Sequence, residues 1–409
     1  MFDVEACRRE FPALAARPQS IFLDGPGGTQ VPRRVIDALT DYLTRCNANH
    51  AGCFATSRES DAVIAEAHRA AADLLNAPAP EEIVFGQNMT TLTWHLSHAL
   101  RRTLEPGDEI IVSELDHDAN ISPWASAARE AGAVCHRIPI RLDDCTLDLA
   151  AYRQLLGKRT RLVAVGCASN AVGTINDVRD VARLAHAAGA LVFLDAVHYA
   201  PHGIIDVQAW DCDFLACSAY KFFGPHVGVL WGRRALLEKL LPDKVRPASN
   251  ALPDKWMTGT QNHEGLAGLT AAVHYLADLG AKLAPTASTR RERLVAALEA
   301  IRAYEAGLAR QLLDGLAARP GFTVWGIADP ARLHERCPTI AVTHQEASPE
   351  RLAEHLASQD IFSWNGNMYA LALCERLGLE EKGGLLRLGI VHYNTAAEID
   401  RLLRSLDTI

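Results

Sequence analysis

Short runs rich in β-branched and aromatic residues alternate with longer stretches rich in Ala and Leu through the middle of the chain. We predict strands at residues 110–115, 161–169, 191–196, 213–219 and 227–232. Helical patterns at residues 122–132 and 177–189 separate some of these runs. This alternation predicts an α/β fold with a mainly parallel sheet and helices on both faces. Several runs are apolar throughout, which is typical of strands buried on both faces.

The pattern changes after residue 262. Residues 263–318 are helical almost throughout, and a smaller α/β unit follows them. Its predicted strands are residues 322–327, 339–344 and 385–391, and its predicted helices lie near 349–358 and 395–406. A chain of 409 residues has room for two or three domains. The expected division is a large domain at 20–262, connecting helices at 263–290, and a small domain made of 1–19 and 291–409.

Composition excludes several classes of function. A net charge of −8 argues against a nucleic-acid binder that acts through bulk charge. The same charge gives no reason to expect an anionic membrane as a partner. The start of the chain has early acidic residues and no apolar run, and no stretch is long enough to span a membrane. Ten scattered cysteines without a CxxC motif are typical of free thiols in a reducing compartment, so we expect a cytoplasmic protein without a structural metal.

Asp195 and Lys221 are the most informative pair of residues. Asp195 ends one predicted strand and Lys221 follows the next one. In open α/β sheets, ligands bind at the carboxyl ends of the strands. A partly desolvated lysine there can form a Schiff base, and an aspartate can hold a protonated pyridine nitrogen, which together indicate pyridoxal 5′-phosphate (PLP). Taken singly, each residue could also be an ordinary surface group at a strand end.

Other polar residues follow the same strands. Thr90 stands where a helix begins, and a helix N-terminus binds phosphate, although Asn and Thr also serve as plain caps. His117 could stack on a pyridine ring, and His198 could hydrogen-bond a phenolic oxygen. Asn170 ends a predicted strand at the same edge. For each histidine, an ordinary loop residue is the alternative.

The chain resembles PLP enzymes of the class V aminotransferase fold, and among them it is most similar to the group II cysteine desulfurases. The similarity runs from FLDGPGGTQVP at residue 22 to residue 403. The segments that carry it are VFGQNMTT, SELDHDANISPW, ASNAVGT, FLDAVH, SAYKFFGP, TGTQN and LRLGIVHYNT. The resemblance implies PLP-dependent transferase fold type I, with a large seven-stranded type of sheet domain and a small α/β C-terminal domain. It also implies PLP as the cofactor and a homodimer as the active unit.

The resemblance assigns roles to the residues around the cofactor ring. Lys221 would hold PLP and shuttle protons, and Asp195 would pair with the pyridinium nitrogen. His117 would stack on the ring. His198 stands where desulfurases carry a Gln that contacts the phenolic oxygen.

The resemblance also assigns the phosphate and the substrate carboxylate. It implies phosphate contacts from Thr90, Ser218 and Tyr220, with Tyr220 in place of the usual His, and from Thr260 reaching across to the other subunit. Asn170 would approach both cofactor and substrate. Arg387 would bind the α-carboxylate of the substrate as a bidentate fork.

One segment departs from the desulfurase pattern. Desulfurases carry a nucleophilic cysteine on a mobile loop, whereas residues 361–371 here read IFSWNGNMYAL, with Tyr369 at or beside the cysteine position. A tyrosine cannot carry a persulfide. Cys374 lies in a predicted helix and is expected to be a core thiol. The residues expected to shape the substrate pocket, unless they only pack between the domains, are Trp364, Asn367, Met368 and Tyr369.

The sequence therefore predicts a PLP enzyme that acts on an L-amino acid through an external aldimine, with lyase-type or α-carbanion chemistry. The alternatives are an aminotransferase and a true desulfurase that uses Cys374 or another thiol. A metallohydrolase built on Asp195, His198 and His202, and a regulator that binds the cofactor without turnover, stay open as well. A nicotinamide enzyme is disfavoured, because GPGG at residues 25–28 lacks the GxGxxG register.

Overall fold

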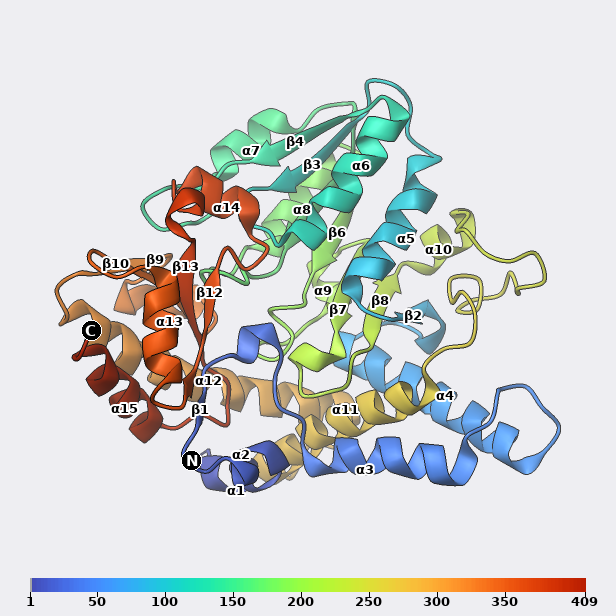
Figure 1. Ribbon diagram of the computed structural model, residues 1–409. Coiled ribbons are helices and arrows are strands. Elements are labelled where there is room, and N and C mark those ends of the chain that lie inside the picture. Colours follow the sequence, from blue (N-terminus) through green and yellow to red (C-terminus); the bar gives the residue numbers. More distant parts are fainter. Residues whose placement is uncertain (1) are drawn as a thin grey trace.

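The computed structural model describes residues 2–409 and has a seven-stranded sheet at its centre (Figure 1). The strand order is β2-β8-β7-β6-β5-β3-β4. Neighbours from β7 to β4 run parallel, and β8 runs antiparallel to both β7 and β2. The strands are β2 (Ile83–Gly86), β3 (Glu109–Ser113), β4 (Val134–Ile138), β5 (Thr160–Gly166), β6 (Leu191–Asp195), β7 (Phe214–Ser218) and β8 (Gly228–Gly232). The predicted α/β fold with a mainly parallel sheet is confirmed.

Alternate residues of these strands enter two separate apolar layers. The first layer packs against α4 (Ala55–Leu75), α8 (Val178–Ala187) and α11 (His263–Leu283), and the second against α5 (Met89–Arg101) and α6 (Ser122–Ala131). Strand residues in the first layer include Val163, Val165, Val192, Leu194, Leu215, Cys217 and Val229. Those in the second include Leu162, Ala164, Phe193, Phe214, Ala216 and Leu230. Burial on both sides explains why the sequence runs are apolar throughout rather than alternating.

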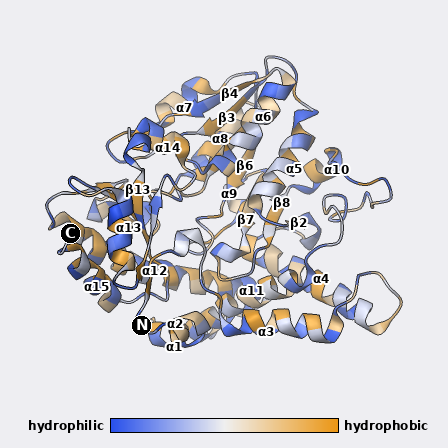
Figure 2. Cartoon of the chain, in the orientation of Figure 1, coloured by the Kyte–Doolittle hydropathy of each residue, from blue (hydrophilic) through white to orange (hydrophobic). Residues whose placement is uncertain are grey.

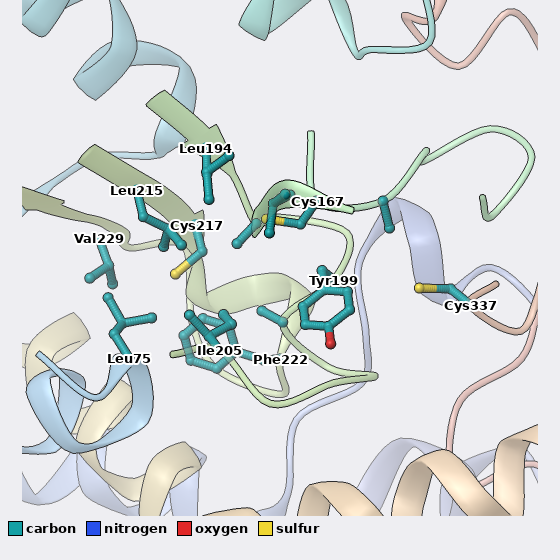
Figure 3. Close-up of a cluster of buried hydrophobic side chains, with 14 of the residues drawn as sticks. Leu75, Cys167, Leu194, Tyr199, Ile205, Leu215, Cys217, Phe222, Val229 and Cys337 are labelled. Atoms are coloured by element: carbon teal, nitrogen blue, oxygen red, sulfur yellow. The ribbon is translucent and has the colours of Figure 1, made fainter. Parts of the chain in front are cut away.

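Figure 3 shows part of the first layer, where Leu194, Leu215 and Val229 extend from three neighbouring strands toward Leu75 of α4. Figure 2 shows the same division in hydropathy, with the central strands mostly orange and α3 (Arg33–Asp41) banded blue and orange along its length. The sheet is therefore a rigid, dry platform, and polar chemistry is confined to its edges.

A second, four-stranded antiparallel sheet has the order β12-β13-β10-β9. Its strands are β9 (Phe322–Trp325), β10 (Thr339–His344), β12 (Trp364–Gly366) and β13 (Leu385–Gly389). It packs with α13 (Pro349–Ala357), α15 (Ala396–Leu406) and the C-terminal half of α12 (Arg290–Ala317) in its own apolar cluster. A parallel pair, β1 (Ile21–Phe22) with β11 (Ile361–Phe362), joins the N-terminal segment to this unit.

The long helical region is two helices, because Pro285 follows α11 and the Thr289 side chain caps α12 together with Glu292. The other helices are α1 (Val4–Arg9), α2 (Pro12–Ala16), α7 (Leu149–Leu155), α9 (Val207–Trp210), α10 (Arg234–Lys239) and α14 (Leu371–Arg376). No helix within residues 2–409 is long and apolar enough to cross a membrane. The boundaries proposed above between the large domain, the connecting helices and the small domain stay predictions.

The contact between α11 and α12 predicts opposite effects for two glycine substitutions. A Cβ on Gly280 of α11 would lie 1.7 Å from the carbonyl oxygen of Arg293 on α12, whereas a Cβ on Gly307 of α12 meets nothing within 4 Å. We expect Gly280→Ala to force the helices apart and to lower the free energy of unfolding by about 1–3 kcal/mol. Gly307→Ala should raise it by about 0.5–1 kcal/mol, because alanine loses less entropy in a helix. Urea unfolding measures both, and a Gly280→Ala protein as stable as the wild type would contradict the packing.

Candidate active site

The carboxyl ends of β3, β5, β6 and β7 bring the predicted site residues to one edge of the sheet. Asp195 ends β6 opposite Gly166 of β5, and its carbonyl accepts a 2.7 Å hydrogen bond from the Cys167 amide. Lys221 follows β7 within a single 3-10 turn. β4, which follows β3 in the chain, lies on one side of β3 at the edge of the sheet, and β5 lies on the other side of β3. The direction in which strands are added therefore reverses between β3 and β5, which makes this place a topological switch point. Ligands of open α/β sheets bind at such points.

Lys221 is held at the lip of the sheet with its amine partly removed from water. Its Nζ donates a hydrogen bond to the carbonyl of Pro26 and lies 4.8 Å from the centre of the Tyr220 ring. Burial, and then the charge of Arg387, lower the pKa of Lys221 to about 7, while Asp195 acts in the opposite direction. A large fraction of this amine is therefore neutral, and nucleophilic, at neutral pH.

Asp195 is buried beside this lysine. Its Oδ1 accepts a 2.8 Å hydrogen bond from the Val197 amide. Burial raises the pKa of Asp195 to about 6, and the Val197 hydrogen bond and the charge of Lys221 oppose that rise. A cationic group brought against this carboxylate would favour its ionised form.

The N-terminus of α5 lies against the end of β7 and gathers the residues predicted to bind phosphate. The Met89 amide donates to Ser218 Oγ at 3.0 Å, and the Thr91 amide donates to the side chain of the N-cap residue Asn88 at 2.9 Å. Within residues 2–409 the amide of Thr90 has no hydrogen-bond partner, and its side chain is exposed. β8 can pack closely against the start of α5 because residue 228 is a glycine. A Cβ at Gly228 would lie only 2.5 Å from the carbonyl carbon of Asn88. An anion at this N-terminus would find both a free N–H and a positive dipole end.

Tyr220 and Thr260 are the other two residues predicted to bind phosphate. The Tyr220 ring stacks on His226 with 5.0 Å between centroids. Thr260 is exposed and lines a surface hollow of about 300 Å³ together with Gln87 and Thr91. The role predicted for Thr260 in a second subunit stays a prediction.

His117 begins a 3-10 turn after β3 and has a fixed orientation. Its Nδ1 accepts a 3.0 Å hydrogen bond from the Ala119 amide. Tyr369 covers one face of its ring, with centroids 5.2 Å apart and planes 17° from parallel. Burial and the charge of Lys221 lower the pKa of His117 to about 4, so the ring is neutral. The predicted stacking on the cofactor would use the ring's other face.

A buried network that sequence reasoning did not assign supports this turn. Asp116 Oδ1 accepts from the Gly166 amide at 2.7 Å, and its Oδ2 accepts from the Asn120 side chain at 3.1 Å. The Trp124 indole N–H in turn donates to Asn120 at 3.0 Å. Burial raises the pKa of Asp116 to about 8. The network ties the His117 turn to the end of β5, and the only signal in the sequence was the spacing Asp116–Asn120–Trp124 around a helix start.

Arg387 reaches the site from β13 of the second sheet. It is buried, and its Nη1 donates a 2.8 Å hydrogen bond to the carbonyl of Asn170. The Asn170 side chain donates in turn to the carbonyl of Met368 at 2.8 Å. Burial lowers the pKa of Arg387 to about 10, and Asp24 opposes this, so the guanidinium stays charged at neutral pH.

Several buried polar atoms around Lys221 have no partner. Among residues 2–409 these unpaired atoms include Asp24 Oδ1, Asn170 Oδ1, His198 Nε2 and Arg387 Nε. An unsatisfied buried polar atom costs about 1–3 kcal/mol, so four in one place indicate that a polar ligand belongs there. The residues therefore fit a ligand that carries an anionic group and further hydrogen-bonding atoms.

The segment Asp24–Gly28 is a part of the site to which the sequence analysis assigned no role beyond the start of the family resemblance. Pro26 receives the hydrogen bond of Lys221, and a Cβ on Gly389 of β13 would lie 1.9 Å from Pro26 Cδ. Thr29 then anchors the segment, since its amide and its hydroxyl both donate to the Tyr220 carbonyl. A glycine-rich run directly after an apolar pair was the signal for such a close approach.

The turn at Asn367–Ala370 closes the site from the second sheet. Met368 and Tyr369 both have left-handed φ values, 56° and 58°, and the Tyr369 carbonyl accepts a 2.7 Å hydrogen bond from the Asp118 amide. Asn367 donates to Glu380 at 3.0 Å and accepts from the Tyr369 amide at 3.0 Å. These bonds favour a role for Asn367 in holding the turn, and its predicted contact with substrate stays a prediction.

Trp364 and Tyr369 are large aromatic side chains of this region that are 52% and 72% exposed. Trp364 lies on Gly27, where a Cβ would come within 2.4 Å of the indole Nε1. Tyr369 lies on His117, as described above. Both therefore stand at the rim of the site, and packing between the two sheets accounts for part of their contacts.

Most of the thiols are removed from solvent. Cys374 is fully buried in α14, and burial raises its pKa to about 12. All ten cysteines are free; Cys53 is exposed, Cys135 is half-buried, and the others are buried. Reactive cysteines need exposure and a lowered pKa.

The zinc hypothesis lacks a set of ligands. His202 Nδ1 lies 2.8 Å from Glu305 Oε2 and is engaged there. In the part of the chain that the structure describes, residues 2–409, no group of three His, Cys, Asp or Glu side chains is arranged to hold a metal ion.

Comparisons with known proteins agree with this geometry. The family model described as Aminotransferase class-V matches residues 21–402. The chain is 34% identical to the aminotransferase-like protein FGM3 of Gibberella zeae, over 100% of this chain and 98% of the relative. It is 31% identical to a cysteine desulfurase of Pectobacterium atrosepticum, again over 100% and 98%. The solved structure of the cysteine desulfurase CsdA from Escherichia coli has a TM-score of 0.86 at 29% identity and covers 100% of this chain and 98% of that one.

The environment of Lys221 predicts how its amine reacts with pH. Because its pKa is about 7, the neutral amine accumulates as the pH rises through 7. In the cofactor-free protein, pulse acylation followed by mass spectrometry should therefore label Lys221 with a midpoint near pH 7. Asp195→Asn should move the midpoint lower, because the Asp195 charge favours the ammonium form. The exposed Lys158 serves as an internal standard for the reagent. A midpoint above pH 9, or an upward shift in Asp195→Asn, would contradict this electrostatic description.

Proposed function

The chain belongs to the class-V aminotransferase family of PLP-dependent enzymes, and from this premise we propose that it acts at the α-carbon of an L-amino acid without the persulfide step of a cysteine desulfurase. The observation that carries the proposal is the convergence of Lys221, Asp195 and Arg387 at one edge of the seven-stranded sheet, beside unpaired polar atoms. An amine, a buried carboxylate and a buried guanidinium match the cofactor aldehyde, the cofactor ring nitrogen and a substrate carboxylate, in that order.

The residues that would hold the cofactor have matching chemistry. Lys221 offers a largely neutral amine, and Asp195 a buried carboxylate. The free amide of Thr90, close to Ser218, suits the phosphate. The unpaired Nε2 of His198 suits the phenolic oxygen. Bound there, PLP supplies an electron sink for the bond that is broken at the α-carbon.

The protein's own groups then orient the substrate and move protons. Arg387 keeps its Nη1 on the Asn170 carbonyl and has its Nε free, so one edge of the fork can bind a carboxylate. Lys221 Nζ, with a pKa near 7, can both accept and return a proton at the α-carbon. The His117 ring and the Tyr369 turn cover the site and reduce its access to water.

The fate of the substrate differs from that in a desulfurase. Tyr369 occupies the turn where a desulfurase is expected to carry its persulfide cysteine. A tyrosine has no thiol that could accept sulfur from the substrate. Cys374 lies five positions further on, buried and with a raised pKa, which disfavours it as a substitute. Lyase-type or α-carbanion chemistry needs only the remaining groups, and so does the alternative, transamination.

We also propose a homodimer in the cytoplasm as the working form. Thr260 lies on an exposed surface hollow beside the first turn of α5, where a second subunit could place its own Thr260 near the phosphate end. The support for this arrangement is the resemblance to the family together with the exposure of that threonine.

The cofactor prediction is tested by reductive labelling. Wild-type protein mixed with PLP should show an absorbance band that borohydride bleaches, with the cofactor then found on the peptide that contains Lys221. Lys221→Ala should lose the covalent label and bind PLP only weakly. The exposed Lys158 again serves as the control position, since Lys158→Ala should behave as the wild type. Absence of the label at Lys221 in the wild type would refute the proposed function.

The sulfur prediction is tested with L-cysteine. The wild type should form no alanine from L-cysteine, and Cys374→Ala and Cys53→Ala should not differ from it, because neither thiol takes sulfur from the substrate. Alanine formation that Cys374→Ala abolishes would restore the desulfurase alternative. Conversion of an added amino acid into its keto acid, one equivalent per active site, would instead favour the aminotransferase.

A further inference from the structure

A buried acid–base pair lies behind the active site and has no part in the chemistry described so far. His202 Nδ1 lies 2.8 Å from Glu305 Oε2, and the two side chains are 4% and 1% exposed. His202 belongs to the turn after β6, whereas Glu305 lies in the middle of α12. Burial raises the pKa of Glu305, and the contact with His202 opposes that rise. Isolating two such groups from water is unfavourable, so the pair gives weak support to stability by itself.

The pair is directly connected to the site through His198. The His198 ring packs edge to face on His202, with 5.5 Å between centroids and 64° between planes. His198 is buried, and its Nε2 is one of the unpaired atoms of the pocket. Burial, followed by the charges of His202, Arg387 and Lys221, lowers the pKa of His198. His198 is therefore a neutral ring with one N–H to offer, and its orientation decides where that N–H points.

We infer that Glu305 and His202 are positioning residues that hold the His198 ring in an orientation directed at the phenolic oxygen of the cofactor. Glu305 fixes the His202 ring through Nδ1, and the fixed His202 ring fixes the plane of His198 by edge-to-face packing. A carboxylate hydrogen-bonded to an imidazole fixes the orientation of that ring, as the outer partners of metal-binding histidines do. This inference rests on the proposed binding of PLP at Lys221.

The surroundings of the pair bear on any measurement against pH. A hollow of about 300 Å³ between α12 and the segment before β10 reaches the pair from the other side. The titratable or charged groups that face the pair from the packed elements are Glu299, Arg302, His334, Arg336, Cys337 and His392. Glu299 is exposed on the same helix and lines the same hollow, so it makes a matched control.

The test follows the absorbance of the PLP-bound protein against pH. A hydrogen bond to the phenolic oxygen favours its deprotonated form, so losing that bond should raise the midpoint of the titration by about 0.5–1 pH unit. We expect this rise in His198→Ala and an equal rise in the double variant His202→Phe/Glu305→Leu, whose apolar side chains refill the space. Adding His198→Ala to the double variant should produce no further rise, because coupled residues are not additive. Glu299→Ala should titrate as the wild type.

A folded double variant with the wild-type midpoint, or a triple variant with an additive rise, would overturn the inference and leave the pair a purely structural contact. If circular dichroism shows that the double variant does not fold, the single variant Glu305→Met is measured instead. Methionine has a volume similar to that of glutamate but offers no oxygen to the His202 Nδ1. The midpoint should rise in the same direction, and an unchanged midpoint would again overturn the inference. A wild type that binds no PLP at Lys221 would refute the proposed function itself, so the two failures are distinguishable.

Discussion

The desolvation of Lys221 at the end of a strand buried on both faces is the constraint on which the rest of the site depends. Burial, together with the nearby guanidinium of Arg387, makes its amine a base that titrates near neutral pH. Asp195 moderates that effect without cancelling it. The two apolar layers of the sheet keep this edge rigid and dry on both sides. A solvated lysine on a mobile loop would have neither the altered pKa nor the fixed position.

The site is assembled from two sheets, and the contacts between them determine its shape. Arg387 comes from the second sheet, yet it donates to the Asn170 carbonyl at the edge of the first. Pro26 bridges the same gap from the N-terminal segment, between Lys221 and Gly389. The relative placement of amine and guanidinium, and hence the size of substrate that fits between them, follows from these bridges rather than from either sheet alone.

The turn that carries Tyr369 gives the site its particular character. It is tied to the first sheet by a hydrogen bond to Asp118 and by stacking on His117, and two left-handed residues bend it into place. Such strain persists only when surrounding contacts enforce it. A turn fixed in this way covers the edge of the sheet beside His117.

The sequence by itself determined the parallel sheet, because strands buried on both faces must be apolar throughout, and this pattern is legible without coordinates. It also located Asp195 and Lys221 at strand ends, because the carboxyl ends of parallel strands share one edge. Only the tertiary structure decided that Tyr369 covers His117 and that Glu305 pairs with His202. These contacts join residues far apart in the chain across independent packing layers, and no local pattern or periodicity encodes which of many polar side chains will meet there.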